Sequence, residues 1–85
     1  LHNFPNPFAN STTINYTIPI RFKNAEVTLT VFDMLGKKVS ILVKAIQNPG
    51  TYSAVFSGNG LRQGIYFYRL KVNKHTTLRK MVLTE

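Results

Sequence analysis

Apolar and polar side chains alternate along most of this chain, and Pro, Gly and Asn interrupt the alternation at short intervals. Alternation places the apolar side chains on one face of an extended strand, whereas a helix repeats them every three or four residues. A chain of 85 residues with this many short runs has no room for the crossover helices that parallel strands need. The pattern therefore predicts an all-β protein of antiparallel strands with almost no helix.

The alternating runs predict six or seven strands. A single sheet of that size would leave one apolar face in water, so two packed sheets are expected. We predict a small immunoglobulin-like antiparallel β-sandwich of about seven strands. Its predicted core consists of Tyr16, Ile18, Val27, Leu29, Val31, Tyr52, Phe56, Tyr66, Tyr68 and Leu70.

Three short segments carry signals for turns or irregular pairing. Asp33 to Gly36 predicts a hairpin turn, because the Asp33 carboxylate can accept hydrogen bonds from nearby backbone N–H groups and Gly36 can adopt a positive φ. Asn48-Pro49-Gly50 predicts a second turn. Ile41-Leu42-Val43 breaks the alternation, which indicates a β-bulge or an exit from the sheet.

Composition indicates one domain, since 44% apolar residues in so short a chain suffice for one small core. Residues 1–11 hold two prolines and three asparagines, so we expect an extended Pro- and Asn-rich N-terminal segment there and the β-sandwich domain at 12–85. The chain starts at Leu1 without a basic and apolar leader, which favours a piece of a longer polypeptide. Its apolar runs are far too short for a transmembrane segment.

The chain is strongly basic, with eleven Lys and Arg against three acids and a net charge of +8. Five of these cations lie in the last seventeen residues: Arg69, Lys71, Lys74, Arg79 and Lys80. Solvated strand faces and edges account for dispersed cations, and Lys on an edge also discourages aggregation. The alternative is an electrostatic docking surface made by the C-terminal group. We expect no specific nucleic acid partner, because dispersed cations give only non-specific phosphate contacts.

Few side chains could support catalysis or hold a metal. The three acids, Glu26, Asp33 and Glu85, are scattered, so paired-carboxylate chemistry is not expected. His2 and His75 have no acid at ligand spacing, and the absence of cysteine removes thiolate nucleophiles and thiolate metal ligands. We predict a protein that is not an enzyme and that needs no cofactor and no metal.

Six motifs follow one another along nearly the whole chain. They are Phe4–Phe8, Ser11–Ile14, Leu29–Val39, Pro49–Tyr52, Leu61–Leu70 and Arg79–Leu83. In this order and at this spacing, the chain resembles the type A C-terminal sorting domain of the type IX secretion system.

The resemblance implies a role in protein export. Such domains end cargo proteins of Bacteroidota and relatives, carry them from the periplasm across the outer membrane, and are cleaved off or used for attachment to surface lipopolysaccharide. The implied partners are an upstream cargo domain in the same parent chain, the outer-membrane secretion machinery and a sortase-like protease, and the implied final location is secreted or at the cell surface. A monomer is expected. The implied sorting positions are Pro5, Asn6, Pro7, Gly36, Gly50, Gly64, Tyr66, Lys80 and Val82.

We further predict that residues 80–85 are an address read by the export machinery, bound by strand addition or through a cationic outer face of Arg69, Lys71, Arg79 and Lys80. The alternative function is a non-catalytic immunoglobulin-like accessory module, for surface or polysaccharide adhesion or for structural assembly in the manner of hook-capping proteins. Position in the parent protein separates the two, because a sorting domain must come last. The sequence pattern ends at Leu83, two residues before the chain does, which favours sorting.

Overall fold

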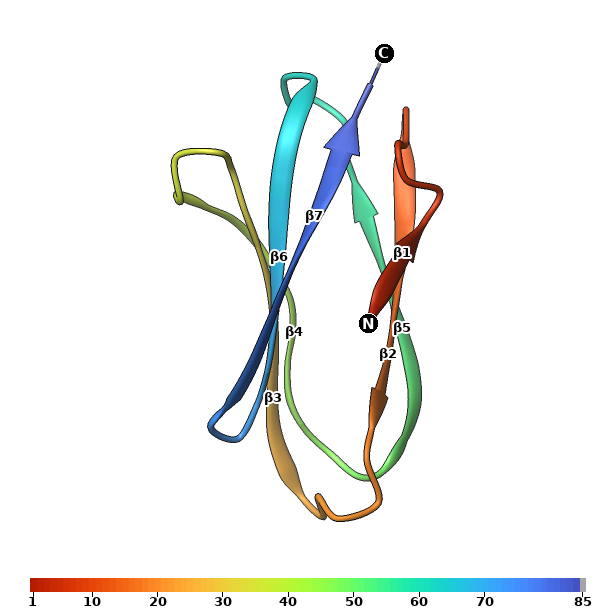
Figure 1. Ribbon diagram of the computed structural model, residues 1–85, viewed down its shortest axis with the longest axis vertical. Coiled ribbons are helices and arrows are strands. Elements are labelled where there is room, and N and C mark those ends of the chain that lie inside the picture. Colours follow the sequence, from red (N-terminus) through yellow and green to blue (C-terminus); the bar gives the residue numbers. More distant parts are fainter. Residues whose placement is uncertain (85) are drawn as a thin grey trace.

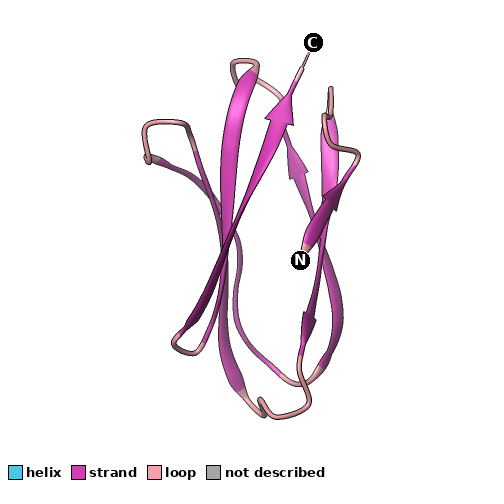
Figure 2. Cartoon of the chain, in the orientation of Figure 1, coloured by secondary structure: helices cyan, strands magenta, loops and turns pink. Residues whose placement is uncertain are grey.

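Strands make up all of the regular secondary structure that the computed structural model describes, which covers residues 1–84 (Figure 2). They are β1 (His2–Phe4), β2 (Ser11–Ile18), β3 (Ala25–Phe32), β4 (Lys38–Gln47), β5 (Gly50–Ser57), β6 (Gly64–Val72) and β7 (His75–Leu83). A three-stranded sheet has the order β1-β2-β5, and a four-stranded sheet has the order β4-β3-β6-β7. Every pairing of these strands is antiparallel, and the two sheets face each other (Figure 1). The predicted all-β sandwich is confirmed.

The core lies between the two sheets and contains nine of the ten predicted side chains. Tyr52 is the exception, because it is only partly buried. Its ring stacks on Tyr16 with 5.5 Å between centroids, and its hydroxyl donates to the Asn48 backbone oxygen at 2.6 Å, near the chain reversal before β5. The polar end of Tyr52 thus reaches the surface while its ring covers the core. Phe8, Met81 and Leu83 are also buried, although the predicted core did not include them.

Local turn chemistry follows the sequence prediction. Asp33 Oδ1 accepts the backbone N–H groups of Leu35 and Lys37, each at 2.9 Å, and Gly36 has a φ of 84°. The predicted bulge is present as well, because Leu29 pairs with Val43 whereas Thr30 pairs with Ile41. One residue of β4 is therefore unpaired at this point, and the strand continues beyond it to Gln47.

The N-terminal segment, residues 1–11, packs against the sandwich. His2–Phe4 pairs with β2, and Phe8 is 1% exposed and forms a parallel bridge with Leu83. The segment is extended, and it also contributes a strand and a core side chain. The boundary at residue 12 stays a prediction. No helix in residues 1–84 is long and apolar enough to cross a membrane.

Candidate functional site

The N-terminal segment runs along the outer edge of β7, where it brings Asn6, Lys80 and Val82 together. The Val82 backbone N–H donates to Asn6 Oδ1 at 3.0 Å, and Asn6 Nδ2 is 3.4 Å from the Lys80 backbone oxygen. Next to them, Phe8 N–H donates to the Val82 oxygen at 2.9 Å and Thr84 N–H donates to the Phe8 oxygen at 2.8 Å. The Asn6 amide therefore takes the place of a neighbouring strand's backbone beside β7.

Proline on both sides of Asn6 explains why a side chain does this pairing. Pro5 and Pro7 have no backbone N–H, so the segment cannot form a regular ladder with β7 at these positions. The Pro5 backbone oxygen is held instead by the Thr12 hydroxyl, which donates to it at 2.8 Å. With this contact on one side and buried Phe8 on the other, Asn6 is fixed against β7.

A buried polar network connects the same segment to β6. The Tyr68 hydroxyl donates to Asn3 Oδ1 at 2.9 Å, and Asn3 Nδ2 donates to Thr12 Oγ1 at 3.1 Å. Burial raises the pKa of Tyr68 above its ordinary value of 10.0, and the charge of Arg79 opposes that rise. Sequence reasoning missed this network. The signal available was Tyr68 itself, since a tyrosine predicted inside a core needs a partner for its hydroxyl.

Gly64 and Tyr66 belong to the same end of the sandwich. They pair with Leu83 and Met81 of β7, and the Tyr66 hydroxyl donates to the Arg62 backbone oxygen at 2.6 Å. Gly64 has a φ of 148°, a conformation that favours glycine, at the point where the loop enters β6. Seven of the nine implied sorting residues thus meet around the end of β7.

Of the other two positions, Gly36 lies in a turn beside Gly64 and Tyr66, and only Gly50 lies far from that group. Gly36 is in the turn between β3 and β4. The residues that precede it in this turn line a groove of about 500 Å³ together with residues 60–66. Gly50 pairs with Ile18 at the opposite end of the sandwich (Figure 1). The structure therefore does not bring all nine positions into one site, and Gly50 is placed in the chain reversal between β4 and β5.

The predicted cationic face needs one correction. Lys80 pairs with Phe67, and Arg69 pairs with Leu78, so Arg69 and Lys80 point to the outer side of the four-stranded sheet. Arg79 pairs with the buried Tyr68, and its Nε is 3.4 Å from the Leu1 backbone oxygen. The prediction that Arg79 shares the outer face was wrong, because adjacent strand residues point to opposite faces. Glu85, the last residue of the predicted address, lies outside the described residues.

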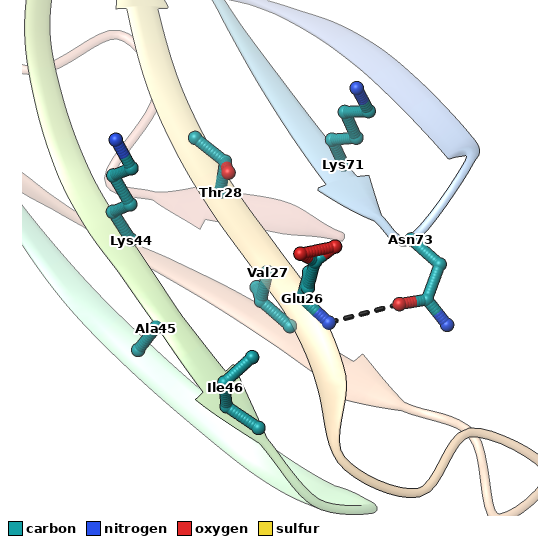
Figure 3. Close-up of a pocket in the computed structure, with 8 residues that line it drawn as sticks. All are labelled: Glu26, Val27, Thr28, Lys44, Ala45, Ile46, Lys71 and Asn73. Atoms are coloured by element: carbon teal, nitrogen blue, oxygen red, sulfur yellow. Dashed lines mark hydrogen bonds between the residues drawn. The ribbon is translucent and has the colours of Figure 1, made fainter.

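An open hollow of about 430 Å³ lies on the outer side of the four-stranded sheet, and its lining includes Glu26, Lys44 and Lys71. Figure 3 shows these side chains. Glu26 is near the start of β3 and Asp33 follows its end, so the two described acids are about 20 Å apart along the strand. Within residues 1–84 no cluster of three His, Cys, Asp or Glu residues could hold a metal ion. The geometry offers contact surfaces and a strand edge.

Comparison with known proteins gives one match. A family described as the secretion system C-terminal sorting domain matches residues 2–84. No curated protein and no solved structure matches the chain. The matched range includes residues 2–11 of the N-terminal segment and all seven strands described above.

Proposed function

This chain belongs to the secretion system C-terminal sorting domain family, and we propose that it is the tail that carries one cargo protein across the outer membrane by type IX secretion. The family match over residues 2–84 is the observation that carries this proposal. It favours sorting over the adhesion or assembly module that the fold alone would also allow, because the same sandwich architecture serves many unrelated functions.

In this proposal the cargo precedes the domain in the same parent chain and passes through the periplasm with it. The outer-membrane machinery then exports the fusion, and a sortase-like protease removes the tail or attaches the cargo to the cell surface. The role requires no catalytic or cofactor site in the domain itself. The structure supports it through a small folded unit whose N-terminal segment, where the cargo would be joined, is anchored by buried Phe8.

We propose that the machinery recognises the end of β7 together with the N-terminal segment. Pro5, Asn6, Pro7, Gly64, Tyr66, Lys80 and Val82 make up this composite site. The outer edge of β7 is already hydrogen-bonded to Asn6 and Phe8 near its C-terminal end. The backbone groups of an edge strand point away from the sheet at every second residue, and in β7 those of Val82 and Lys80 do so. Leu78 is the next residue with outward backbone groups, so the open part of the edge is centred on it. A receptor strand would pair there, beside Asn6.

The structure also changes how the address should be tested. Deleting residues 80–85 would remove Met81 and Leu83, which are 0% and 3% exposed, so the deletion would disrupt the core. Single substitutions are cleaner. Asn6→Ala removes the amide that bridges to β7, and Asn10→Ala is a matched control, since the Asn10 contact with Gly58 uses its backbone oxygen.

The test fuses the 85-residue chain behind a neutral periplasmic reporter in a host that carries the secretion system. We expect the intact fusion to reach the medium or cell surface and the reporter alone to stay in the periplasm. Asn6→Ala should lower export several-fold while the periplasmic fusion stays protease-resistant, and Asn10→Ala should not. Failure to export the intact fusion, or equal export in a host without the secretion system, would refute the sorting function.

A further inference from the structure

Charged side chains on the strands are distributed very unequally between the two outer faces of the sandwich. By the pairing registers, the outward positions of the three-stranded sheet hold no Lys, Arg, Asp or Glu among the described residues. The outward positions of the four-stranded sheet carry Lys38, Lys44, Arg69, Lys71 and Lys80, with Glu26 as their one acid. We call this surface the basic face. Its five cations against one acid favour an anionic partner.

The basic face also exposes large apolar side chains. Ile41 and Ile46 on β4 and Leu78 on β7 are 47%, 62% and 56% exposed, and their pairing places them on the same side of the sheet as the cations. Partly buried Phe32 and Phe67 lie between them, paired with each other across β3 and β6. A strand face whose lysines only keep it in contact with water would not need large exposed apolar side chains beside them. The face therefore combines positive charge with apolar contact area.

A groove of about 500 Å³ lies within the basic face. Phe32, Phe67, Leu78 and Arg69 line it, together with Thr76 and residues of the hairpin between β3 and β4. The Arg69 guanidinium is 4.9 Å from the centroid of the Phe32 ring, which holds the cation at the groove. Asp33 also lines the groove, but its Oδ1 already accepts two backbone N–H groups of the hairpin.

We propose that the basic face is a docking surface for an acidic protein segment, which places an apolar side chain in the groove and a carboxylate against Arg69. This inference rests on the proposed sorting function and names the chemistry of the partner that recognises the domain. A groove whose lining includes the Phe32 and Phe67 rings fits a single protruding side chain, as interface hot spots do. A bilayer presents no such protrusion, and an acidic polysaccharide supplies charge without an apolar side chain.

The test is binding of defined acidic peptides to the ¹⁵N-labelled 85-residue chain, followed by NMR. The probe is the blocked peptide EDLDE, and the peptide EDSDE keeps its charge without the apolar side chain. We expect saturable shifts at Phe32, Phe67 and Leu78 with EDLDE, binding at least about fivefold weaker with EDSDE, and weakening by added salt.

Arg69→Gln should weaken EDLDE binding up to about fivefold, as for a partly exposed ion pair. Arg21→Gln is a matched control, because the Arg21 guanidinium also stacks on a phenylalanine, 4.7 Å from the Phe22 centroid, outside the strands. Arg21→Gln should leave the affinity unchanged.

Absence of saturable shifts up to about 10 mM peptide, or equal weakening by the two Arg variants, would overturn the proposal. Equal binding of the two peptides would also overturn it. The same holds if phosphatidylglycerol-containing vesicles or polygalacturonate bind to the same residues of the protein more tightly than EDLDE does. The assay contains no secretion machinery. A negative result beside normal export of the intact fusion would therefore reject the acidic partner and leave the sorting function standing.

Discussion

Phe8→Ala tests whether the N-terminal segment is part of the folded core. The Phe8 ring is 1% exposed and packs edge-to-face on Phe56, with 6.1 Å between centroids. Truncating a buried phenylalanine costs about 3–5 kcal/mol through lost transfer energy and the cavity that remains. A domain of this size has a total stability of about 4–13 kcal/mol, so the loss should be a large fraction of it.

Urea unfolding followed by circular dichroism measures this effect. Phe4→Ala is the matched control, because Phe4 belongs to the same segment but is 74% exposed, and its free energy of unfolding should change by less than about 0.5 kcal/mol. If Phe8→Ala does not fold, Phe8→Leu should still fold, at a cost of about 1.5 kcal/mol or less. A Phe8→Ala variant no less stable than Phe4→Ala would show that the segment does not contribute to the core.

Three further predictions concern the core and its titration. Leu29→Ala should lower the free energy of unfolding by about 2–5 kcal/mol, since Leu29 is 0% exposed; a urea midpoint close to that of the unmodified chain would contradict this. Gly58→Ala should cost about 1–3 kcal/mol in the same assay, because the added Cβ would lie 2.8 Å from Leu83 Cδ1 in the core, and an unchanged midpoint would mean that Leu83 moves aside freely. Burial raises the folded-state pKa of Tyr68, so the unfolded chain loses that proton first as the pH rises. The contribution of Tyr68 to the free energy of unfolding should therefore be constant below about pH 10 and fall above that pH. Urea titrations measure this fall, and a Tyr68→Phe variant that loses the same unfolding free energy at alkaline pH would contradict its assignment to Tyr68.

Local sequence determined the strands and their turns. The hairpin at Asp33 and Gly36 and the bulge beside Ile41 depend on φ preferences, side-chain hydrogen bonds to the nearby backbone and the two-residue period, all of which act within a few residues. The same period predicted most of the core, because one face of each strand must be buried. Tyr52 is less buried than this period predicts, because its hydroxyl reaches the Asn48 backbone oxygen at the surface.

The candidate site depended on the tertiary structure. Asn6 and Val82 are 76 positions apart, and nothing near either residue indicates that a side-chain amide would cover the edge of β7. The basic face likewise arises from strand order, since β4, β3, β6 and β7 bring cations from distant parts of the chain onto one sheet. Alternation determines which face of its strand a side chain occupies. Only the assembly of both sheets determines whether that face packs against the core, packs against the N-terminal segment or is exposed to water. The physical reason is that pairing and packing free energies belong to contacts between distant segments, which no local pattern contains.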